Sequence, residues 1–202
     1  MSEIMSDNIN MKKYNGRNAI FLDRDGTIIE DVGYINNPDD IRFSYGAIEG
    51  LKALYKAGFA LIVISNQSGL ARGIITEQQF QSVHNRFVEL LRENEIVLTD
   101  CFYCPYYKNG VVKKYCMDSR DRKPYPGMII KAARKHNIVL ENSFMIGDKE
   151  DDIRAGQSAG VKTIKIGNSP DEKTFVNPDF FADNLAEAAK IILSTVRVFE
   201  KD

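Results

Sequence analysis

The chain has 202 residues, 44% of them hydrophobic and 27% charged, which is the balance of an ordinary globular protein and excludes a collagen-like or strongly disordered one. A formal net charge of −1 gives no electrostatic reason for general nucleic-acid binding, and no apolar run approaches the roughly 20 residues that span a bilayer. We therefore expect one main domain, with no nucleic-acid or membrane partner.

The N-terminal residues 1–18 are mostly polar and lack the continuous apolar stretch of a secretory signal. They are expected to form a flexible leader before a single domain over 19–202. The cysteines, Cys101, Cys104 and Cys116, are an odd number within one segment, which disfavours a disulfide framework and favours a reducing cytoplasm. The sequence leaves the oligomeric state open, and a monomer is our expectation.

The first predicted strand, 19–22, is wholly apolar and ends abruptly at Asp23 and Asp25. Because side chains alternate along an extended chain, these two carboxylates can point the same way. Such a pair can bind a divalent cation or divide the roles of nucleophile and acid/base. From the local pattern alone, solvated aspartates at a strand exit remain the alternative.

Apolar runs and helical spacing alternate along the rest of the chain. Helices are predicted at 47–57, 76–93, 128–133, 151–159 and 185–196, and further strands at 59–64, 101–104, 144–146 and 161–166. This order predicts an α/β fold, a doubly wound parallel sheet with helices on both faces. The segment 105–126 has no periodicity and is interpreted as an elaborated loop.

Polar residues follow three of the predicted strands, at Asp23, Ser65 and Asp148. The carboxyl ends of parallel strands lie at one edge of a sheet, where open α/β folds bind their ligands. We therefore expect one crevice to collect these side chains, which makes solvated strand exits a poorer explanation.

Four motifs occur in a fixed order: Asp23-Arg24-Asp25-Gly26-Thr27, Ser65-Asn66-Gln67-Ser68-Gly69, Arg122-Lys123-Pro124 and Gly147-Asp148-Lys149. Together they resemble the haloacid dehalogenase superfamily of phosphotransferases over about residues 19–166. Within it, the chain is similar to the branch of heptose bisphosphate and histidinol phosphate phosphatases. The resemblance implies a Rossmann-like fold, and the short excursions after Asp25 and Ser65 leave no room for a large cap domain.

The resemblance implies that Asp23 is a nucleophile that forms an aspartyl-phosphate, and that Asp25 is the general acid/base. Ser65 would donate a hydrogen bond to the phosphoryl group, and Lys123 would hold phosphate and nucleophile together. Magnesium would be bound by the Asp23 carboxylate, the backbone carbonyl of Asp25 and the Asp148 carboxylate. One of Asp151 and Asp152 is expected to support this metal loop.

The resemblance also implies substrate contacts around the same crevice. The residues are Asp31, Val32, Gly33, Tyr34, Ser65, Asn66, Gln67, Ser68, Arg122, Lys123 and Lys149. The expected reaction is hydrolysis of the C7 phosphate of D-glycero-D-manno-heptose 1,7-bisphosphate. Alternatives are histidinol phosphate or another small sugar phosphate, and a non-enzymatic receiver-like domain that accepts phosphate on Asp23.

The long loop departs from the branch, which commonly carries a structural zinc site there. Cys104 keeps the first expected ligand, but Tyr106 stands where histidine is expected, and Ser119 and Asp121 replace the second cysteine pair. Three of four ligands are missing, so we expect magnesium and no zinc. Whether Cys101, Cys104 and Cys116 bind any metal stays open.

Overall fold

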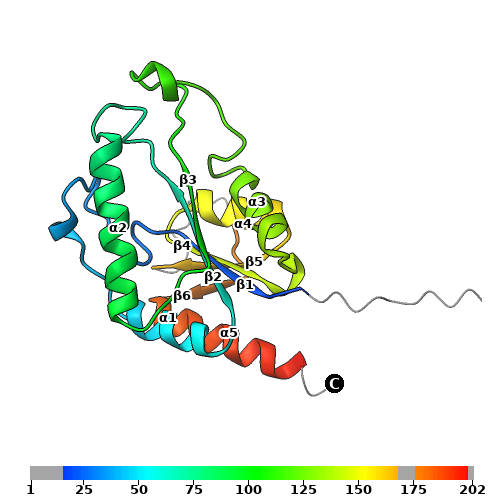
Figure 1. The fold of residues 1–202 in the computed structure, drawn as a ribbon. Coiled ribbons are helices and arrows are strands. Elements are labelled where there is room, and N and C mark those ends of the chain that lie inside the picture. The colour runs from blue at the N-terminus through cyan, green and yellow to red at the C-terminus, as the bar shows by residue number, and fades with distance from the viewer. Residues whose placement is uncertain (1–15, 168–175, 200–202) are drawn as a thin grey trace, which may run out of the picture.

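The computed structural model describes residues 16–167 and 176–199. Its centre is a six-stranded parallel sheet in the order β3-β2-β1-β4-β5-β6 (Figure 1). The strands are β1 (Ala19–Leu22), β2 (Ala60–Asn66), β3 (Asp100–Cys104), β4 (Phe144–Gly147), β5 (Lys162–Ile166) and β6 (Phe180–Ala182). The prediction of a doubly wound parallel sheet is confirmed.

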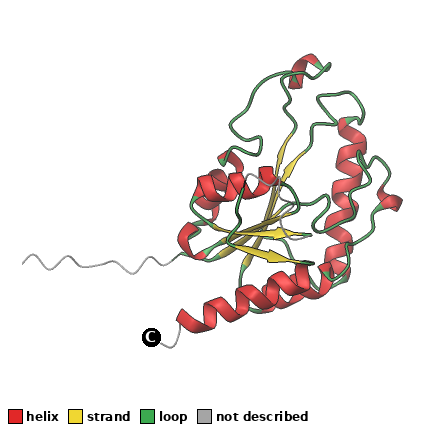
Figure 2. Cartoon of the chain, turned by 180° about the vertical axis from the view of Figure 1, so that it is seen from behind, coloured by secondary structure: helices red, strands yellow, loops and turns green. Residues whose placement is uncertain are grey.

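Helices cover both faces of the sheet, as Figure 2 shows from behind. They are α1 (Ala47–Lys56), α2 (Glu77–Glu93), α3 (Gly127–His136), α4 (Glu150–Ala159) and α5 (Leu185–Phe199). Helices α1, α2 and α5 share one apolar core with the sheet, and α3 and α4 share a second. The result is a three-layer sandwich.

Strand β1 illustrates how the two cores form. Its four residues are fully buried, with Ile20 and Leu22 in the core of α1, α2 and α5, and Ala19 and Phe21 in the core of α3 and α4. This alternation follows from the two-residue period of a strand. A central parallel strand therefore needs apolar side chains at every position, which is why 19–22 is a continuous apolar run.

The strand order reverses beside β1. The chain runs outward from β1 through β2 to β3, then returns to the other side of β1 and runs outward from β4 through β5 to β6. Such a switch point leaves a crevice at the carboxyl ends of the strands that flank it. Asp23, Ser65 and Asp148 lie in or just after β1, β2 and β4, at this edge.

Several boundaries differ from the predictions. Strand β2 runs through Asn66, so that Ser65 lies inside the strand and not after it. The edge strand β6 was not predicted, because a three-residue strand carries little local signal and is fixed by its pairing with β5.

Most of the predicted leader, 1–15, lies outside the described residues. Its last part is not a loose segment, since the Arg17 N–H donates to the carbonyl of Asn137 and the Arg17 carbonyl accepts from Val139. The side chain of Val196, predicted to line the last helix, is also outside the described residues. No helix among the described residues has the length and apolar character needed to cross a membrane.

The segment 105–126 leaves the carboxyl end of β3 and projects beyond the sheet at the top of Figure 1. It contains one short 3-10 helix, Lys113–Tyr115. Backbone N–H groups of Val111 and Val112 both donate to the carbonyl of Ala71, in the segment that follows β2. The loop is thereby attached to the crevice side of the molecule.

Helices α1 and α5 approach each other closely at Gly50, where a Cβ atom would overlap the backbone carbonyl of Leu185. We expect Gly50→Ala to lower the free energy of unfolding by about 1–3 kcal/mol in urea denaturation, as overpacking does. In a helix without such a contact, replacing glycine by alanine stabilises the helix by about 0.8–1.0 kcal/mol. The sign of the change in unfolding free energy therefore tests the close approach. Glu49→Ala, on the exposed side of the same turn, is the control, and a stabilised Gly50→Ala would contradict the close approach.

Candidate active site

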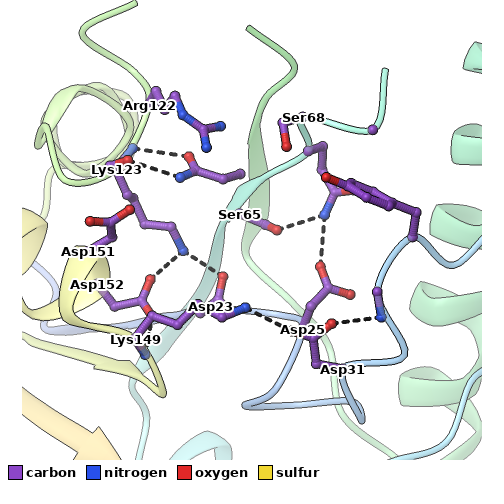
Figure 3. A pocket seen from close by; sticks show the side chains of 15 residues that line it. Asp23, Asp25, Asp31, Ser65, Ser68, Arg122, Lys123, Lys149, Asp151 and Asp152 are labelled. Atoms are coloured by element: carbon purple, nitrogen blue, oxygen red, sulfur yellow. Dashed lines mark hydrogen bonds and ion pairs between the residues drawn. The ribbon is translucent and has the colours of Figure 1, made fainter. Parts of the chain in front are cut away.

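A pocket of about 330 Å³ lies at the carboxyl ends of β1 and β2 (Figure 3). It is lined mainly by charged and polar side chains from all four sequence motifs. The lining residues are Asp23, Asp25, Asp31, Gly33, Tyr34, Ser65, Asn66, Gln67, Ser68, Gly69, Arg122, Lys123, Lys149, Asp151 and Asp152.

Lys123 is the centre of the pocket's polar network. Its side chain is 3% exposed, and its Nζ atom lies 2.5 Å from Asp23 Oδ1 and 2.6 Å from Asp152 Oδ1. It also donates to the carbonyl of Ile64 at 2.8 Å. One ammonium group therefore joins the end of β1, strand β2 and the first turn of α4.

The backbone of Lys123 is held by Asn66. The Asn66 amide donates to the Lys123 carbonyl and accepts from the Lys123 N–H, both at 3.0 Å. Asn66 was predicted as a substrate contact, and it does line the pocket. The nitrogen and oxygen of its side-chain amide, however, both bind the backbone of the loop that carries Lys123. This contact joins segments far apart in the chain, so the local sequence does not reveal it.

The carboxylates outnumber the cations at this point. Burial raises the pKa of Asp23 to about 7, an increase that the charge of Lys123 reduces and the neighbouring carboxylates Asp152 and Asp25 enlarge. For Lys123, burial lowers the pKa, but Asp152 and Asp23 more than compensate, so the net pKa is raised and the side chain stays protonated. The site therefore has room for more positive charge.

Ligand atoms of Asp23, Asp148 and Asp152 all lie within 4.8 Å of one another. Asp148 Oδ1 is buried and has no hydrogen-bond partner within the described residues, and burial raises the pKa of this carboxyl. A divalent cation would satisfy such an atom, and carboxylate oxygens are the ligands that Mg²⁺ prefers. The residues present therefore fit a divalent metal.

Asp152 already has other partners. Besides Lys123, it accepts from the backbone N–H of Lys149 at 3.0 Å, at the start of α4. Asp23 and Asp148 are therefore the two carboxylates freest to hold a metal. Gly26 allows this arrangement, because it has φ +90° and a Cβ atom there would overlap the Asp148 carboxylate.

The carboxylate of Asp25 lines the same pocket as that of Asp23. Gln67 Nε2 donates to Asp25 Oδ2 at 2.9 Å and to Ser65 Oγ at 2.8 Å, which links the two side chains (Figure 3). Ser65 and Gln67 are 1% and 6% exposed. The polar groups at the base of the pocket are thus held in place by one another.

The remaining predicted contacts divide into two groups. Asp31, Gly33 and Tyr34 line the pocket, and Lys149 Nζ donates to Asp31 Oδ2 at 2.8 Å. Val32 is 60% exposed and is not among the lining residues, so the structure does not support its side chain as a contact.

Three lining residues were predicted neither as substrate contacts nor as catalytic or metal residues: Gly69, Asp151 and Asp152. One of Asp151 and Asp152 had been expected to support the metal loop. Asp152 has a buried ion pair with Lys123, whereas Asp151 is exposed. Acidic residues in a first helical turn have a general dipole explanation, so the sequence could not separate these two.

The three cysteines do not join a metal-binding group, and among the described residues the one such group is that of Asp23, Asp148 and Asp152. Cys104 is buried, Cys101 is half-buried and Cys116 is exposed. The loop that carries Cys116 is held instead by Tyr107, whose ring lies 4.0 Å from the guanidinium carbon of Arg72 and 5.3 Å from that of Arg122.

Comparisons with known proteins agree with this site. Residues 121–188 match the HAD-hydrolase-like family model. D-glycero-alpha-D-manno-heptose-1,7-bisphosphate 7-phosphatase from Photorhabdus laumondii is 36% identical over 183 residues, which cover 89% of this chain and 99% of that protein. D-glycero-beta-D-manno-heptose-1,7-bisphosphate 7-phosphatase from Escherichia coli (strain K12) is 37% identical over 177 residues, 86% of this chain and 93% of that protein.

The chain belongs to the haloacid dehalogenase (HAD) phosphatase family. Among solved structures, a putative HAD-like phosphatase from Mesorhizobium loti superposes with a TM-score of 0.80 at 30% identity, covering 91% of this chain and 87% of that one. The D,D-heptose 1,7-bisphosphate phosphatase from B. bronchiseptica, complexed with magnesium and phosphate, superposes with a TM-score of 0.75 at 25% identity, covering 88% and 99%.

Family membership makes this HAD chain a hydrolase and confirms the resemblance that the four motifs predicted. HAD phosphatases use a divalent metal, which agrees with the excess of carboxylates in the pocket.

The buried ion pairs of Lys123 lead to a prediction about stability. Lys123→Met leaves the buried carboxylates of Asp23 and Asp152 without a cation, so we expect the free energy of unfolding at pH 8 to fall by about 3–5 kcal/mol. Urea denaturation measures this change, and added Mg²⁺ should restore part of it.

The matched control is Lys131→Met, which removes a lysine whose side chain is 61% exposed and paired with Asp121. An exposed ion pair contributes about 0.2–1 kcal/mol, so this variant should stay close to the wild type. Equal effects of the two substitutions would show that Lys123 is not the electrostatic centre of the pocket.

Proposed function

We propose that this protein is a magnesium-dependent phosphatase that hydrolyses the C7 phosphate of D-glycero-D-manno-heptose 1,7-bisphosphate. The observation that carries the substrate is the 36–37% identity, over nearly the full length, to relatives named heptose-1,7-bisphosphate 7-phosphatases. The pocket supports the same chemistry, because it gathers carboxylates, a buried lysine and further cations that suit a phosphorylated sugar.

Asp23 is the proposed nucleophile. Its carboxylate oxygen bonds to the C7 phosphorus as the bond from phosphorus to the sugar oxygen breaks, which gives an aspartyl-phosphate. Asp23 lies at the base of the pocket with one oxygen held by Lys123 Nζ, so the direction of attack is set by the fold. In water, repulsion between two anions would oppose this approach.

Positive charge offsets that repulsion. Magnesium, held by the Asp23 and Asp148 carboxylates and the backbone carbonyl of Asp25, would neutralise charge on the phosphoryl group. Lys123 adds a fixed ammonium at the nucleophile, and its charge interacts more strongly as the equatorial oxygens become more negative. Ser65 donates its hydroxyl to the phosphoryl group when the phosphate replaces water in the pocket.

Asp25 is the proposed acid/base. It gives a proton to the departing sugar oxygen in the first step and takes one from water in the second, when the water oxygen bonds to phosphorus and Asp23 is released. Proton transfer of this kind contributes roughly 10²–10⁴-fold in rate. Its contact with Gln67, which also touches Ser65, holds it beside the phosphate position.

Arg122 and Lys149 are proposed to bind the second phosphate of the substrate. Both line the pocket, and Arg122 has a planar fork that matches two phosphate oxygens. Arg122 has no carboxylate partner among the described residues, so its charge is available to a ligand. Asp31, Gly33, Tyr34 and the segment 66–68 would contact the sugar.

We also propose that the protein acts as a monomer in the cytoplasm. All three cysteines are free thiols, which suits a reducing compartment. The pocket described here is formed by residues of one chain. Sedimentation of the purified protein would test the oligomeric state, and fractionation of the cells that produce it would test the compartment.

The function is tested by phosphate release. With Mg²⁺ and heptose bisphosphate, the wild type should release one phosphate per substrate over many turnovers, and Asp23→Asn should reduce kcat at least about 10⁴-fold because no aspartyl-phosphate can form. Removal of the metal with EDTA should abolish release, and Mg²⁺ should restore it.

Histidinol phosphate, heptose 7-phosphate and both anomers of the bisphosphate serve as parallel substrates at equal concentration. Faster turnover of histidinol phosphate would overturn the proposed substrate while leaving the phosphatase intact. Labelling of Asp23 by one phosphate without turnover would instead indicate a receiver-like domain.

The second-phosphate site gives a further prediction. Arg122→Leu should raise KM for heptose bisphosphate about 10–100-fold, the value of a charge-assisted hydrogen bond of about 1.5–3 kcal/mol, and change KM for heptose 7-phosphate little. Arg120→Leu is the matched control, because this exposed arginine lies two residues away and outside the pocket lining. Equal effects on both substrates would place Arg122 elsewhere in the reaction.

A further inference from the structure

Arg24, between the two motif aspartates, is one of the most buried charged side chains of the chain. It is 2% exposed, although arginine is almost never fully buried unless it is paired. Its neighbours in sequence, Asp23 and Asp25, both line the pocket, whereas Arg24 does not. The guanidinium therefore lies behind the pocket wall and cannot be a direct phosphate ligand.

The guanidinium binds the Asp25 carboxylate with its full fork. Arg24 Nη2 lies 2.9 and 3.0 Å from the two carboxylate oxygens, and Nε lies 3.1 and 3.2 Å from the same atoms. Two parallel donor groups on one carboxylate fix its plane as well as its position. A lysine in this place would supply the charge but not the orientation.

Asp25 is the single carboxylate that pairs with Arg24 in the described part of the chain. The third nitrogen, Nη1, is buried without a hydrogen-bond partner there. The charge of Arg24 also acts at longer range on Asp31, but the ion-pair partner of Asp31 is Lys149. A buried cation with one anionic partner holds that partner strongly.

Gln67 completes the support from the other side. Its amide donates to Asp25 Oδ2 and Ser65 Oγ (Figure 3). The Asp25 carboxylate is therefore held by the Arg24 guanidinium and by the Gln67 amide. Asp25 itself is 17% exposed, which leaves it open toward the pocket. The carboxylate can thus exchange a proton with a ligand while its orientation stays fixed.

We propose that Arg24 is a positioning residue that holds Asp25 in the orientation needed for proton transfer, and that it acts on the reaction only through Asp25. This inference rests on the proposed function, because it takes Asp25 as the acid/base. The two buried cations have different partners: Lys123 forms ion pairs with Asp23 and Asp152, and Arg24 forms an ion pair with Asp25.

The consequence depends on the leaving group. A sugar alkoxide must be protonated as it departs, whereas p-nitrophenolate is a stable anion that can leave without a proton. The second step, attack of water on the aspartyl-phosphate, needs the base for either substrate. A misplaced Asp25 should therefore slow both steps with a sugar phosphate but only the second step with p-nitrophenyl phosphate.

The test compares Arg24→Lys with the wild type on both substrates in stopped flow. With heptose bisphosphate, kcat should fall about 10²-fold, as misplacement by about 1 Å can cause, and KM should change less than about 3-fold. With p-nitrophenyl phosphate, the variant should release about one equivalent of p-nitrophenol per enzyme at the wild-type rate and then turn over slowly. Loss of the burst, or an equal loss on both steps, would overturn the proposal.

The burst also separates the two proposals, since it requires a folded pocket and a working Asp23 but no heptose. If the wild type gives a normal burst with p-nitrophenyl phosphate but does not hydrolyse heptose bisphosphate, the proposed substrate is wrong. The role of Arg24 can then still be tested with p-nitrophenyl phosphate. Arg86→Lys is the matched control, because Arg86 also pairs with carboxylates, Glu89 and Glu93, but lies on α2 away from the pocket. It should behave as the wild type does.

Two further measurements keep the proposal falsifiable if Arg24 variants fold poorly. In an Asp25→Asn background, Arg24→Lys should change the residual rate less than about 2-fold, and independent effects would contradict action through Asp25. Asp25→Asn alone should lower the thermal midpoint of the metal-free protein, because Arg24 then keeps a buried charge without a carboxylate. A raised midpoint would contradict the pairing.

Discussion

The structure of the pocket depends on one buried ammonium group. Lys123 Nζ contacts Asp23 after β1, Asp152 in α4 and the carbonyl of Ile64 in β2, so it joins three elements that are separate in sequence. A buried charge is costly unless it is well paired, and these contacts meet that requirement. Asn66 holds the Lys123 backbone in place through both the nitrogen and the oxygen of its side-chain amide.

Two buried cations divide the acidic groups of the site between them. Lys123 neutralises the nucleophile side, while Arg24 neutralises Asp25 from behind the pocket wall. Asp148 receives neither, and its buried Oδ1 has no hydrogen-bond partner in the described ranges 16–167 and 176–199. Lys149 Nζ approaches only the other oxygen, Oδ2, at 4.0 Å. Asp148 therefore keeps one oxygen that a divalent cation would satisfy. The aspartates of the site therefore differ in their charged partners, although the sequence alone does not distinguish them.

The loop 105–126 connects this chemistry to substrate choice. It carries Arg122 and Lys123 into the pocket, and it is attached to the segment after β2 by the N–H groups of Val111 and Val112 on Ala71. The ring of Tyr107 makes cation–π contacts with both Arg72 and Arg122. Hydrogen bonds and cation–π contacts hold the loop within the described residues. Contacts made by the loop itself can therefore set the position of Arg122.

The sequence by itself determined the alternating elements, the two-sided burial of 19–22 and the edge of the sheet at which Asp23, Ser65 and Asp148 meet. The strand period is local, and the alternation of strands and helices along the chain implies a parallel sheet whose strands end at one edge. It also identified the family through four short motifs. The partner of each charged group was decided only in the tertiary structure. Lys123 with Asp152, Asn66 with the Lys123 backbone and the burial of Arg24 depend on distances between segments far apart in the chain, and the short strand β6 depends on its pairing with β5. Local residue patterns do not encode those distances, since they arise only when the layers pack.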